Sequence, residues 1–385
     1  MKSVYTLIAK IIYFIIKTFK LGSGFTWPGY FVLKLFPNAL QDIFSLLPSN
    51  TVIVSGTNGK TTTTKLIANI LTEAGFKTLS NDTGSNLLQG LLTSILLRMS
   101  LSGSLPVNCA ILEVDEAVLP KILPHINPRI ICLLNLSRDQ LDRHWEVDLI
   151  YTRWLASFKL LSSDTKIFYS SVDSIFADLP TLFPTQATAF STADINEDFL
   201  ESSTLYGSFN LLNLACALKV TNYLNIAPPV IVLALKSFEP AYGRGELITY
   251  RDKSFRIFLA KNPASLNANL DMLKSHTSLC NCVLFILNDN VPDGHDVSWI
   301  FDVDPTILKL CCENRQVYVS GSRALDMAVR LCYAGVNVLS ANVNENLEVA
   351  VNQIVLDTSV SNIVIFPNYS AMLQVRKVVV GRSIQ

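Results

Sequence analysis

The stretch Thr51-Val-Ile-Val-Ser-Gly-Thr-Asn-Gly-Lys-Thr-Thr-Thr-Thr-Lys65 decides the fold. Its β-branched apolar run, 52–54, is typical of a buried strand, and Gly56 and Gly59 interrupt it before a segment with helical spacing begins. A strand, a glycine loop and a helix in this order form a phosphate cradle, because backbone N–H groups converge at the helix N-terminus. The stretch therefore predicts an α/β fold with a phosphate site at the end of its first strand.

The residue types in the loop indicate a nucleoside triphosphate. Lys60 would neutralise a phosphate, and the hydroxyl of Thr61 would reach Mg²⁺. The common motif has an earlier first glycine, where this chain has Val54, and the shorter spacing here is similar to that of Mur ligases and folylpolyglutamate synthases. The alternative is a strand–helix turn whose lysine is merely solvated. The residues that we expect to contact ATP are Gly56, Thr57, Asn58, Gly59, Lys60, Thr61 and Thr62.

Length and composition narrow the classes of protein. The 385 residues are enough for two or three domains, and 31 basic against 31 acidic residues leave no field to attract nucleic acid. No run approaches the roughly 20 apolar residues of a membrane span. The eight cysteines form no CxxC pair and follow no secretory signal, so we expect reduced thiols in a cytoplasmic protein and no structural zinc.

The first residues allow two interpretations. Only residues 11–16 form an unbroken apolar run, and Lys2, Lys10, Lys17 and Lys20 fall within an arc of about 80° on a helical projection. The segment would then be a helix packed on its own domain, or a helix lying on the inner membrane surface as a peripheral contact.

Strands alternate with helices along the next part of the chain, which predicts a parallel sheet covered on both faces. We expect a helical segment at 1–48, a central ATP-binding domain at 49–238 and a smaller C-terminal Rossmann-like α/β domain at 239–385. The stretch 171–205 has no clear period. Strands are expected at 51–54, 77–80, 107–114, 129–135 and 165–170, and in the second domain near 255–260, 282–288, 315–320, 335–339 and 363–366.

Polar groups at the carboxyl ends of these strands are the candidate site residues, because ligands bind there in parallel sheets. Glu113 would be the second anionic partner of Mg²⁺, with Asp115 or Glu116 as substitutes, or all three form a solvated acidic turn. The loop 135–144 and the turn 83–86 would line the substrate cleft.

Three further residues are candidates for nucleotide binding. Asn210 and Asn213 share a helix face, so both amides could read an adenine edge, or they are N-terminal capping residues. Arg244 stands between two glycines that would let its guanidinium reach a phosphate.

Taken together, these motifs resemble the Mur ligase family and, most narrowly, its MurT group, over nearly the whole chain. Where ordinary Mur ligases carry a His-Asn-Pro turn, this chain has Lys261-Asn262-Pro263, which favours the MurT group. The stretches that carry the resemblance are Gly56-Thr-Asn-Gly-Lys-Thr-Thr62, Glu113-Val-Asp-Glu116, Asn135-Leu-Ser-Arg-Asp-Gln-Leu-Asp-Arg143, Phe209-Asn-Leu-Leu-Asn213, Ala241-Tyr-Gly-Arg-Gly-Glu246, Leu259-Ala-Lys-Asn-Pro-Ala264, 288–299, Ser320-Gly-Ser-Arg-Ala-Leu-Asp-Met327 and Tyr369-Ser-Ala-Met-Leu373.

The resemblance implies a synthetase subunit that works with a GatD-type glutaminase on lipid II. ATP would phosphorylate the α-carboxylate of the stem-peptide D-glutamate, and ammonia from the glutaminase would convert the acyl phosphate to D-isoglutamine. Lys60 and Glu113 would be catalytic, and Asp296, with Asp293 as second choice, would complete the glutaminase triad. Substrate contacts are expected from Asn86, Asn135, Asp139, Arg143, Lys261 and Asn262.

Two alternatives stay open beside this interpretation. The chain could be a stand-alone ligase that adds an amino acid, or an ATP-binding scaffold that holds a glutaminase without catalysing. One departure from the resemblance is also evident, since many MurT proteins carry a four-cysteine zinc ribbon where this chain has no cysteine in 171–205.

Overall fold

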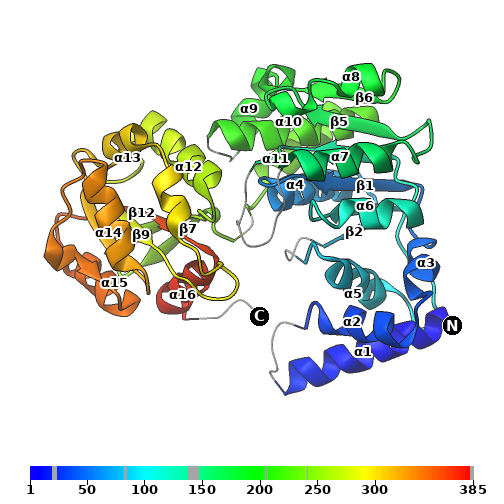
Figure 1. Cartoon of the computed structure of the whole chain (residues 1–385), viewed down its shortest axis with the longest axis horizontal. Coiled ribbons are helices and arrows are strands. Elements are labelled where there is room, and N and C mark those ends of the chain that lie inside the picture. The colour runs from blue at the N-terminus through cyan, green and yellow to red at the C-terminus, as the bar shows by residue number, and fades with distance from the viewer. Residues whose placement is uncertain are drawn as a thin grey trace.

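The computed structural model describes residues 1–19, 24–81, 85–137, 147–203, 205, 207–240 and 242–381. Two six-stranded sheets form the centres of two α/β bodies, which lie side by side in Figure 1. The helices and strands are α1 (Lys2–Thr18), α2 (Trp27–Leu35), α3 (Ala39–Phe44), β1 (Asn50–Ser55), α4 (Lys60–Glu73), β2 (Thr78–Ser80), α5 (Leu88–Arg98), β3 (Cys109–Glu113), α6 (Leu119–Ile122), β4 (Ile130–Leu133), α7 (Val147–Phe158), β5 (Lys166–Ser170), α8 (Leu179–Leu182), β6 (Ala187–Phe190), α9 (Glu197–Ser202), α10 (Ser208–Tyr223), α11 (Pro228–Lys236), β7 (Arg244–Tyr250), β8 (Lys253–Phe258), α12 (Pro263–Ser275), β9 (Cys282–Ile286), α13 (Pro305–Cys312), β10 (Gln316–Ser320), α14 (Ala324–Tyr333), β11 (Val343–Asn344), α15 (Leu347–Leu356), β12 (Asn362–Pro367) and α16 (Tyr369–Val380).

The first sheet is entirely parallel, with the strand order β2-β3-β1-β4-β5-β6. Successive side chains of β1 point to opposite faces, so Ile53 packs with α5, α6 and α7, whereas Val52 and Val54 pack with α4, α10 and α11. Helices therefore cover both faces, and the predicted parallel sheet is confirmed. This arrangement brings the carboxyl ends of β1, β3 and β4 to one edge.

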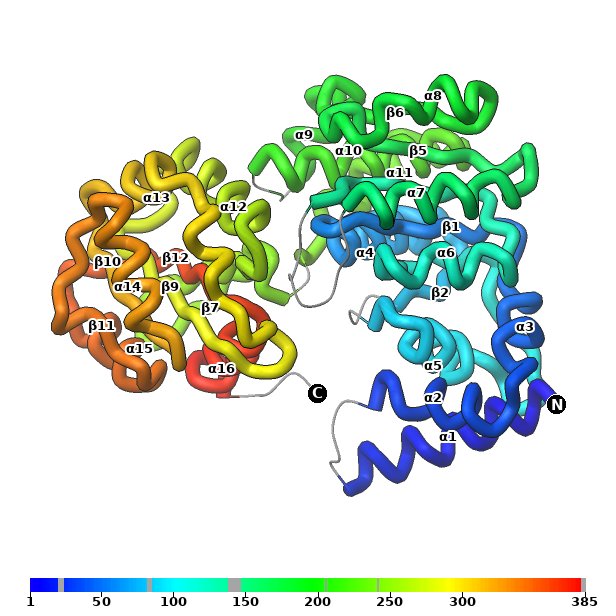
Figure 2. Tube along the Cα trace, in the orientation of Figure 1, coloured from blue at the N-terminus to red at the C-terminus, as the bar shows by residue number. Residues whose placement is uncertain are grey.

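The second sheet has the order β11-β10-β9-β12-β8-β7 and is parallel except for the β7–β8 hairpin. Helices α12, α13 and α14 cover one face, and α15 and α16 cover the other. Figure 2 shows the chain crossing from α11 to this second body and ending with α16 near the gap between the two.

The helices α1, α2 and α3 form a layer on α5, beyond the edge strand β2 (Figure 1). Tyr5 is almost fully buried and its hydroxyl donates to Asp42 Oδ2 at 2.9 Å. Pro37 follows the end of α2 and separates it from α3, so the chain between residues 27 and 44 is helical in two pieces. Among the described residues, no helix is both long and apolar enough to cross a membrane.

Four strand assignments differ from the sequence-based prediction. The segment 335–339 is not a strand, although Val336 and Val338 pack on the core. The alternating apolar residues there reflect burial of these side chains, and the backbone pairs with no neighbouring strand in the described part of the chain. The short strand β11 pairs with β10 instead. Strands β6 and β7 were not predicted, because both are edge strands with largely half-exposed residues.

Seven of the eight cysteines are buried, and Cys332 on α14 is exposed. Burial raises the pKa of the Cys109 thiol to about 12 and that of the Cys311 thiol to about 11. None of the described residues forms a cluster of His, Cys, Asp or Glu that could hold a metal ion.

Gly29 sets the distance between α2 and α5, so Gly29→Ala tests how firmly the helical layer is attached. An added Cβ would lie 2.1 Å from the Gln89 carbonyl oxygen and 2.8 Å from Thr93 Oγ1. We expect a loss of about 1–3 kcal/mol in the free energy of unfolding, measured in urea, because the helices must separate. Gln41→Ala, on the exposed side of α3, is the control and should stay within about 0.5 kcal/mol of the parent. An unchanged value for Gly29→Ala would mean that the layer is loosely held.

Candidate nucleotide-binding site

The loop between β1 and α4 is compact because its glycines allow neighbouring groups to approach. Gly59 has a φ of 89°, and a Cβ added there would lie 2.2 Å from Asn213 Oδ1. A Cβ on Gly56 would lie 2.8 Å from the carbonyl oxygen of Asn135. Neither position has room for a side chain, which explains the two glycines in physical terms.

Asn135, which follows β4, holds the loop in shape. Its carbonyl accepts from the Thr57 N–H at 2.9 Å, and its side-chain oxygen accepts from the Asn58 N–H at 2.8 Å. Its side-chain NH₂ donates to the Asn58 carbonyl at 2.9 Å. The Asn135 side chain is thus committed to the loop, and the substrate contact expected of it stays a prediction.

The ammonium of Lys60 is turned into the loop. It donates to the Gly56 carbonyl, to the Thr57 carbonyl at 3.2 Å and to Glu116 Oε2 at 3.0 Å. Only 6% of Lys60 is exposed. Burial lowers the pKa of Lys60, but the negative charges of Glu116 and Glu113 outweigh that effect and raise the pKa above its ordinary value. Lys60 therefore stays charged across the physiological range.

Glu113, at the end of β3, has one carboxylate oxygen available for a cation. Its Oε1 accepts from Asn86 Nδ2 at 3.1 Å, whereas its Oε2 is buried and has no hydrogen-bond partner among the described residues. Asn81 fixes the backbone by accepting from the Glu113 N–H at 2.7 Å and donating to its carbonyl at 2.8 Å. A buried carboxylate oxygen without a partner, next to a phosphate loop, is suited to bind Mg²⁺ directly or through a water molecule.

Thr61 and Thr62 begin α4 and differ in their surroundings. Thr61 is half-buried, and within the described part of the chain its hydroxyl makes no hydrogen bond, as the metal role requires. The Thr62 hydroxyl is buried and likewise unpartnered among those residues.

Asn210 and Asn213 are both buried on the first turns of α10. Asn213 Nδ2 donates to Asn210 Oδ1 at 3.3 Å, and Asn213 packs against Gly59. The two residues therefore lie beside the phosphate loop. Asn213 also borders a cavity of about 370 Å³ in the first body, lined by Leu134, Ser170, Asp173, Phe190, Phe209 and Leu212 among others.

Groups from the second body complete the site. A cavity of about 210 Å³ lies between the two bodies, and Asn58 and Gly59 line it together with Arg244 and Phe258. No hydrogen bond to the Arg244 guanidinium is found among the described residues. Burial lowers the pKa of Arg244, and the negative charge of Glu113 partly opposes this.

Asn262 joins the second body to the loop. It caps α12 by accepting from the Ser265 N–H at 2.8 Å, and its Nδ2 donates to Asn58 Oδ1 at 3.4 Å. Lys261 precedes it on the same turn. Asn262 thus contacts the nucleotide loop directly, whereas the substrate contact expected of Lys261 stays a prediction.

The two aspartates considered for a partner's active site lie elsewhere, and Asp293 contacts the N-terminus of α16. Asp293 is buried and accepts from the Ser370 N–H at 2.9 Å and from the Ser370 hydroxyl. Burial raises the pKa of Asp293, and those hydrogen bonds partly offset the rise. Asp296 is exposed, and hydrogen bonds from the Ser298 side chain and from the Ser298 N–H, the latter at 2.8 Å, lower the pKa of its carboxylate.

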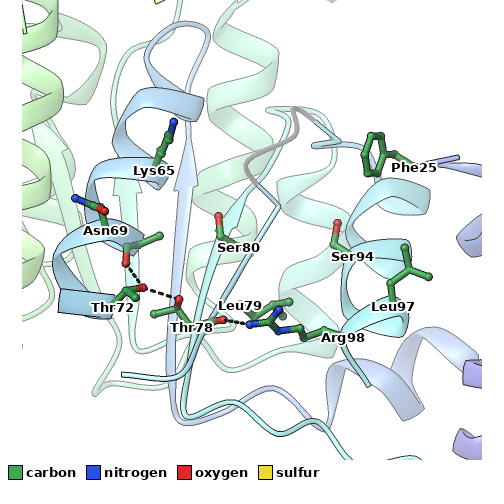
Figure 3. Close-up of a pocket in the computed structure, with 11 residues that line it drawn as sticks. Phe25, Lys65, Asn69, Thr72, Thr78, Leu79, Ser80, Ser94, Leu97 and Arg98 are labelled. Carbon is green, nitrogen blue, oxygen red and sulfur yellow. Dashed lines mark hydrogen bonds between the residues drawn. The ribbon is translucent and has the colours of Figure 1, made fainter. Parts of the chain in front are cut away.

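A larger cavity of about 510 Å³ lies apart from these residues, between α4, β2 and α5 (Figure 3). Lys65 and Arg98 line it from opposite sides, and the Ser80 hydroxyl points into it. It contains none of the site residues predicted from the sequence, so its size alone does not make it the active site.

Two features of the site were missed by sequence reasoning. Glu116 was considered only as a substitute metal ligand, but it is the ion-pair partner of Lys60, and Trp154 Nε1 anchors its carbonyl at 2.9 Å. Asn81 was not singled out, although it supports Glu113. Asp139 and Arg143 lie outside the described residues.

The buried pair of Lys60 and Glu116 gives a pH-dependent prediction. Glu116→Gln leaves a buried ammonium without its counter-ion and should lower the free energy of unfolding by about 3–5 kcal/mol at pH 7. Because the folded-state pKa of Lys60 lies above the ordinary 10.5, the stabilisation by the pair is complete below that pH and is lost as the pH rises beyond it. Urea unfolding between pH 7 and 11 should therefore show the gap between parent and variant narrowing only at the alkaline end.

The matched control is Asp326→Asn, which removes a carboxylate from a part-exposed ion pair with Arg323. It should cost less than about 1 kcal/mol. Equal losses for both variants would contradict a special role for the buried pair.

Comparison with known proteins agrees with this geometry. Residues 54–221 match the Mur ligase middle domain, and residues 259–372 match the MurT ligase C-terminal domain. The subunit MurT of lipid II isoglutaminyl synthase (glutamine-hydrolyzing) from Streptococcus pneumoniae is 26% identical, covering 95% of this chain and 94% of that protein. The same subunit from Staphylococcus aureus N315 is 25% identical over 82% of this chain and 84% of its own length.

Solved structures share the fold. Folylpolyglutamate synthase from Mycobacterium tuberculosis, complexed with ADP and AMPPCP, has a TM-score of 0.64 at 16% identity and covers 92% of this chain and 94% of its own. MurF ligase from Thermotoga maritima, in complex with ADP, has a TM-score of 0.66 at 14% identity, covering 90% and 82% respectively. With both domain models matched in order and MurT relatives aligned over most of the length, the chain is a MurT-like member of the Mur ligase family.

Proposed function

We propose that the chain is the ATP-dependent synthetase subunit of an amidotransferase that converts the stem-peptide D-glutamate of lipid II to D-isoglutamine. The observation that carries the proposal is the loop of Lys60, whose Asn58 and Gly59 line a cavity together with Arg244 of the second body, while Glu113 ends the neighbouring strand β3. Two cations and an acidic metal ligand in one place suit the transfer of a phosphoryl group. The alignment with MurT relatives supports the choice of acceptor.

The site residues would have different roles in binding the nucleotide and stabilising the transferred phosphoryl group. The backbone N–H groups of the loop and the Lys60 ammonium would bind the phosphates, and Lys60 would exchange its loop carbonyls for phosphate oxygens. Thr61 and Glu113 would hold Mg²⁺, which would supply positive charge against the phosphate oxygens. Arg244 would stabilise the charge that develops on the transferred group.

The proposed reaction has two steps. An oxygen of the D-glutamate α-carboxylate attacks the γ-phosphorus of ATP, and ADP leaves. The nitrogen of ammonia next attacks the carbonyl carbon of the acyl phosphate, inorganic phosphate leaves, and the nitrogen loses a proton. Walls from both bodies, including Phe209 and Phe258, would keep water from the acyl phosphate.

The ammonia would come from a GatD-type glutaminase bound as a partner subunit. Of the two aspartates, Asp296 suits the partner's Cys–His pair better, because it is exposed and ionised, whereas Asp293 is buried against Ser370. A lipid-linked acceptor would also bring the protein to the inner face of the cell membrane as a peripheral protein.

The direct test of the proposed reaction is mass analysis of lipid II after incubation with the chain, the glutaminase, ATP, Mg²⁺ and glutamine. We expect the small mass decrease of replacing a carboxyl OH by NH₂, and Lys60→Ala should abolish it because the phosphate loop loses its cation. The exposed Lys159 provides the matched control, Lys159→Ala, which should retain full activity. ATP hydrolysis with a mass increase equal to an added amino acid would instead identify a stand-alone ligase.

Asp296→Asn tests the triad separately from the synthetase chemistry. Glutamine-dependent amidation by the complex should fall by up to about 10⁴-fold, because an amide cannot orient the partner's imidazole in the same way. Amidation driven by added ammonium chloride should be unchanged. Asp302→Asn, an exposed aspartate a few residues away, is the control and should leave both rates intact. Loss of the ammonium-driven rate as well would contradict a role confined to the partner's triad.

A further inference from the structure

Helix α1 has an apolar face that the rest of the described chain leaves uncovered. Five of its side chains, Val4, Leu7, Ile11, Phe14 and Ile15, are 43–69% exposed. At 100° per residue they fall within an arc of about 100°. The buried residues Tyr5, Ala9 and Ile16 lie on the other side of the helix, where α1 packs on its layer. The helix thus has two apolar faces, and only one is used.

The neighbouring helix α2 also has exposed aromatic side chains. Trp27 is 52% exposed and Tyr30 is 43% exposed. The rings of Trp27 and Phe31 stack with centroids 5.8 Å apart, and Trp27 meets Tyr30 edge-on. Exposed tryptophan and tyrosine beside apolar residues are typical of surfaces that sit at the boundary between water and lipid.

The charge of this part of the chain is one-sided. Residues 1–41 contain five lysines and no arginine, aspartate or glutamate, although the whole chain has equal numbers of basic and acidic residues. Lys10 and Lys17 lie about 40–60° beyond Phe14 on the helical projection, at the border of the exposed apolar face. A positive border along one side of an apolar surface is complementary to a bilayer with anionic headgroups.

We propose that the exposed apolar residues of α1, with Trp27 and Tyr30, form a docking surface that lies flat on an anionic phospholipid bilayer. The apolar side chains enter the boundary between headgroups and acyl chains, and the lysines contact headgroup phosphates. A helix of 17 residues is about 25 Å long, which is short of the roughly 30 Å hydrocarbon core, so α1 lies along the surface. The proposal stands on this surface and does not depend on the reaction.

Packed elements connect the docking surface with the candidate site. The layer of α1 and α2 packs on α5, and the turn that leads into α5 holds Asn86, the hydrogen-bond partner of Glu113 (Figure 1).

The test is flotation of the full chain with vesicles of phosphatidylcholine alone or phosphatidylcholine with phosphatidylglycerol, without ATP or substrate. We expect binding to the anionic vesicles and a loss of about tenfold or more in the partition coefficient for the double variant Ile11→Glu/Phe14→Glu. Lys10→Gln and Lys17→Gln should each weaken binding by about fivefold. The control is Leu160→Glu/Leu356→Glu, at two side chains 72% and 79% exposed on other surfaces, which should bind like the parent.

Several results would overturn the proposal. Failure to float with anionic vesicles would do so, as would equal binding to both kinds of vesicle or an equal loss in the Leu160/Leu356 control. A dimer in light scattering that the Ile11/Phe14 variant converts to a monomer, with no vesicle binding, would assign the surface to a second copy of the chain. Urea unfolding of each variant would confirm that the fold is intact. None of these outcomes bears on the amidation assay.

Discussion

The buried positive charge of Lys60 is the constraint on which the nucleotide site depends. An ammonium removed from water needs partners on every side, and here two loop carbonyls and Glu116 provide them. Glu116 is itself held through Trp154, and the loop through Asn135, so β1, β3, β4 and α7 all contribute to one charge. In the free protein the loop carbonyls thereby accept hydrogen bonds from the same Lys60 N–H groups that would otherwise donate to a phosphate.

The local parts of this site could be predicted from the sequence, and the non-local parts could not. A strand, two glycines, Lys60 and Thr61 are contiguous, so their spacing already describes the cradle. The pairing of Lys60 with Glu116 joins residues 56 positions apart, and nothing in either segment marks the choice of Glu116 over Glu113. The strand prediction for 335–339 was wrong for a related reason. Val336 and Val338 alternate in burial, and this sequence pattern is the same whether or not the backbone pairs with a neighbouring strand.

The two bodies meet without a shared hydrophobic core. Their apolar clusters are separate, and Asn58 and Asn262 are joined across the gap by one long hydrogen bond. An interface of this kind costs little to open. The nucleotide would therefore be part of what holds the two bodies in register, since its phosphates and Arg244 would meet in the same cavity.

The uneven burial of the cysteines provides a way to observe the relative position of the two bodies. Cys132 and six other cysteines lie inside the two cores, and only Cys332, on α14 of the second body, meets solvent. Thiol reagents act on the accessible thiolate, so a maleimide dye would attach at that one position without any residue being replaced. Paired with a second fluorophore on the nucleotide, it would turn the opening and closing of the gap into an optical signal from the native chain.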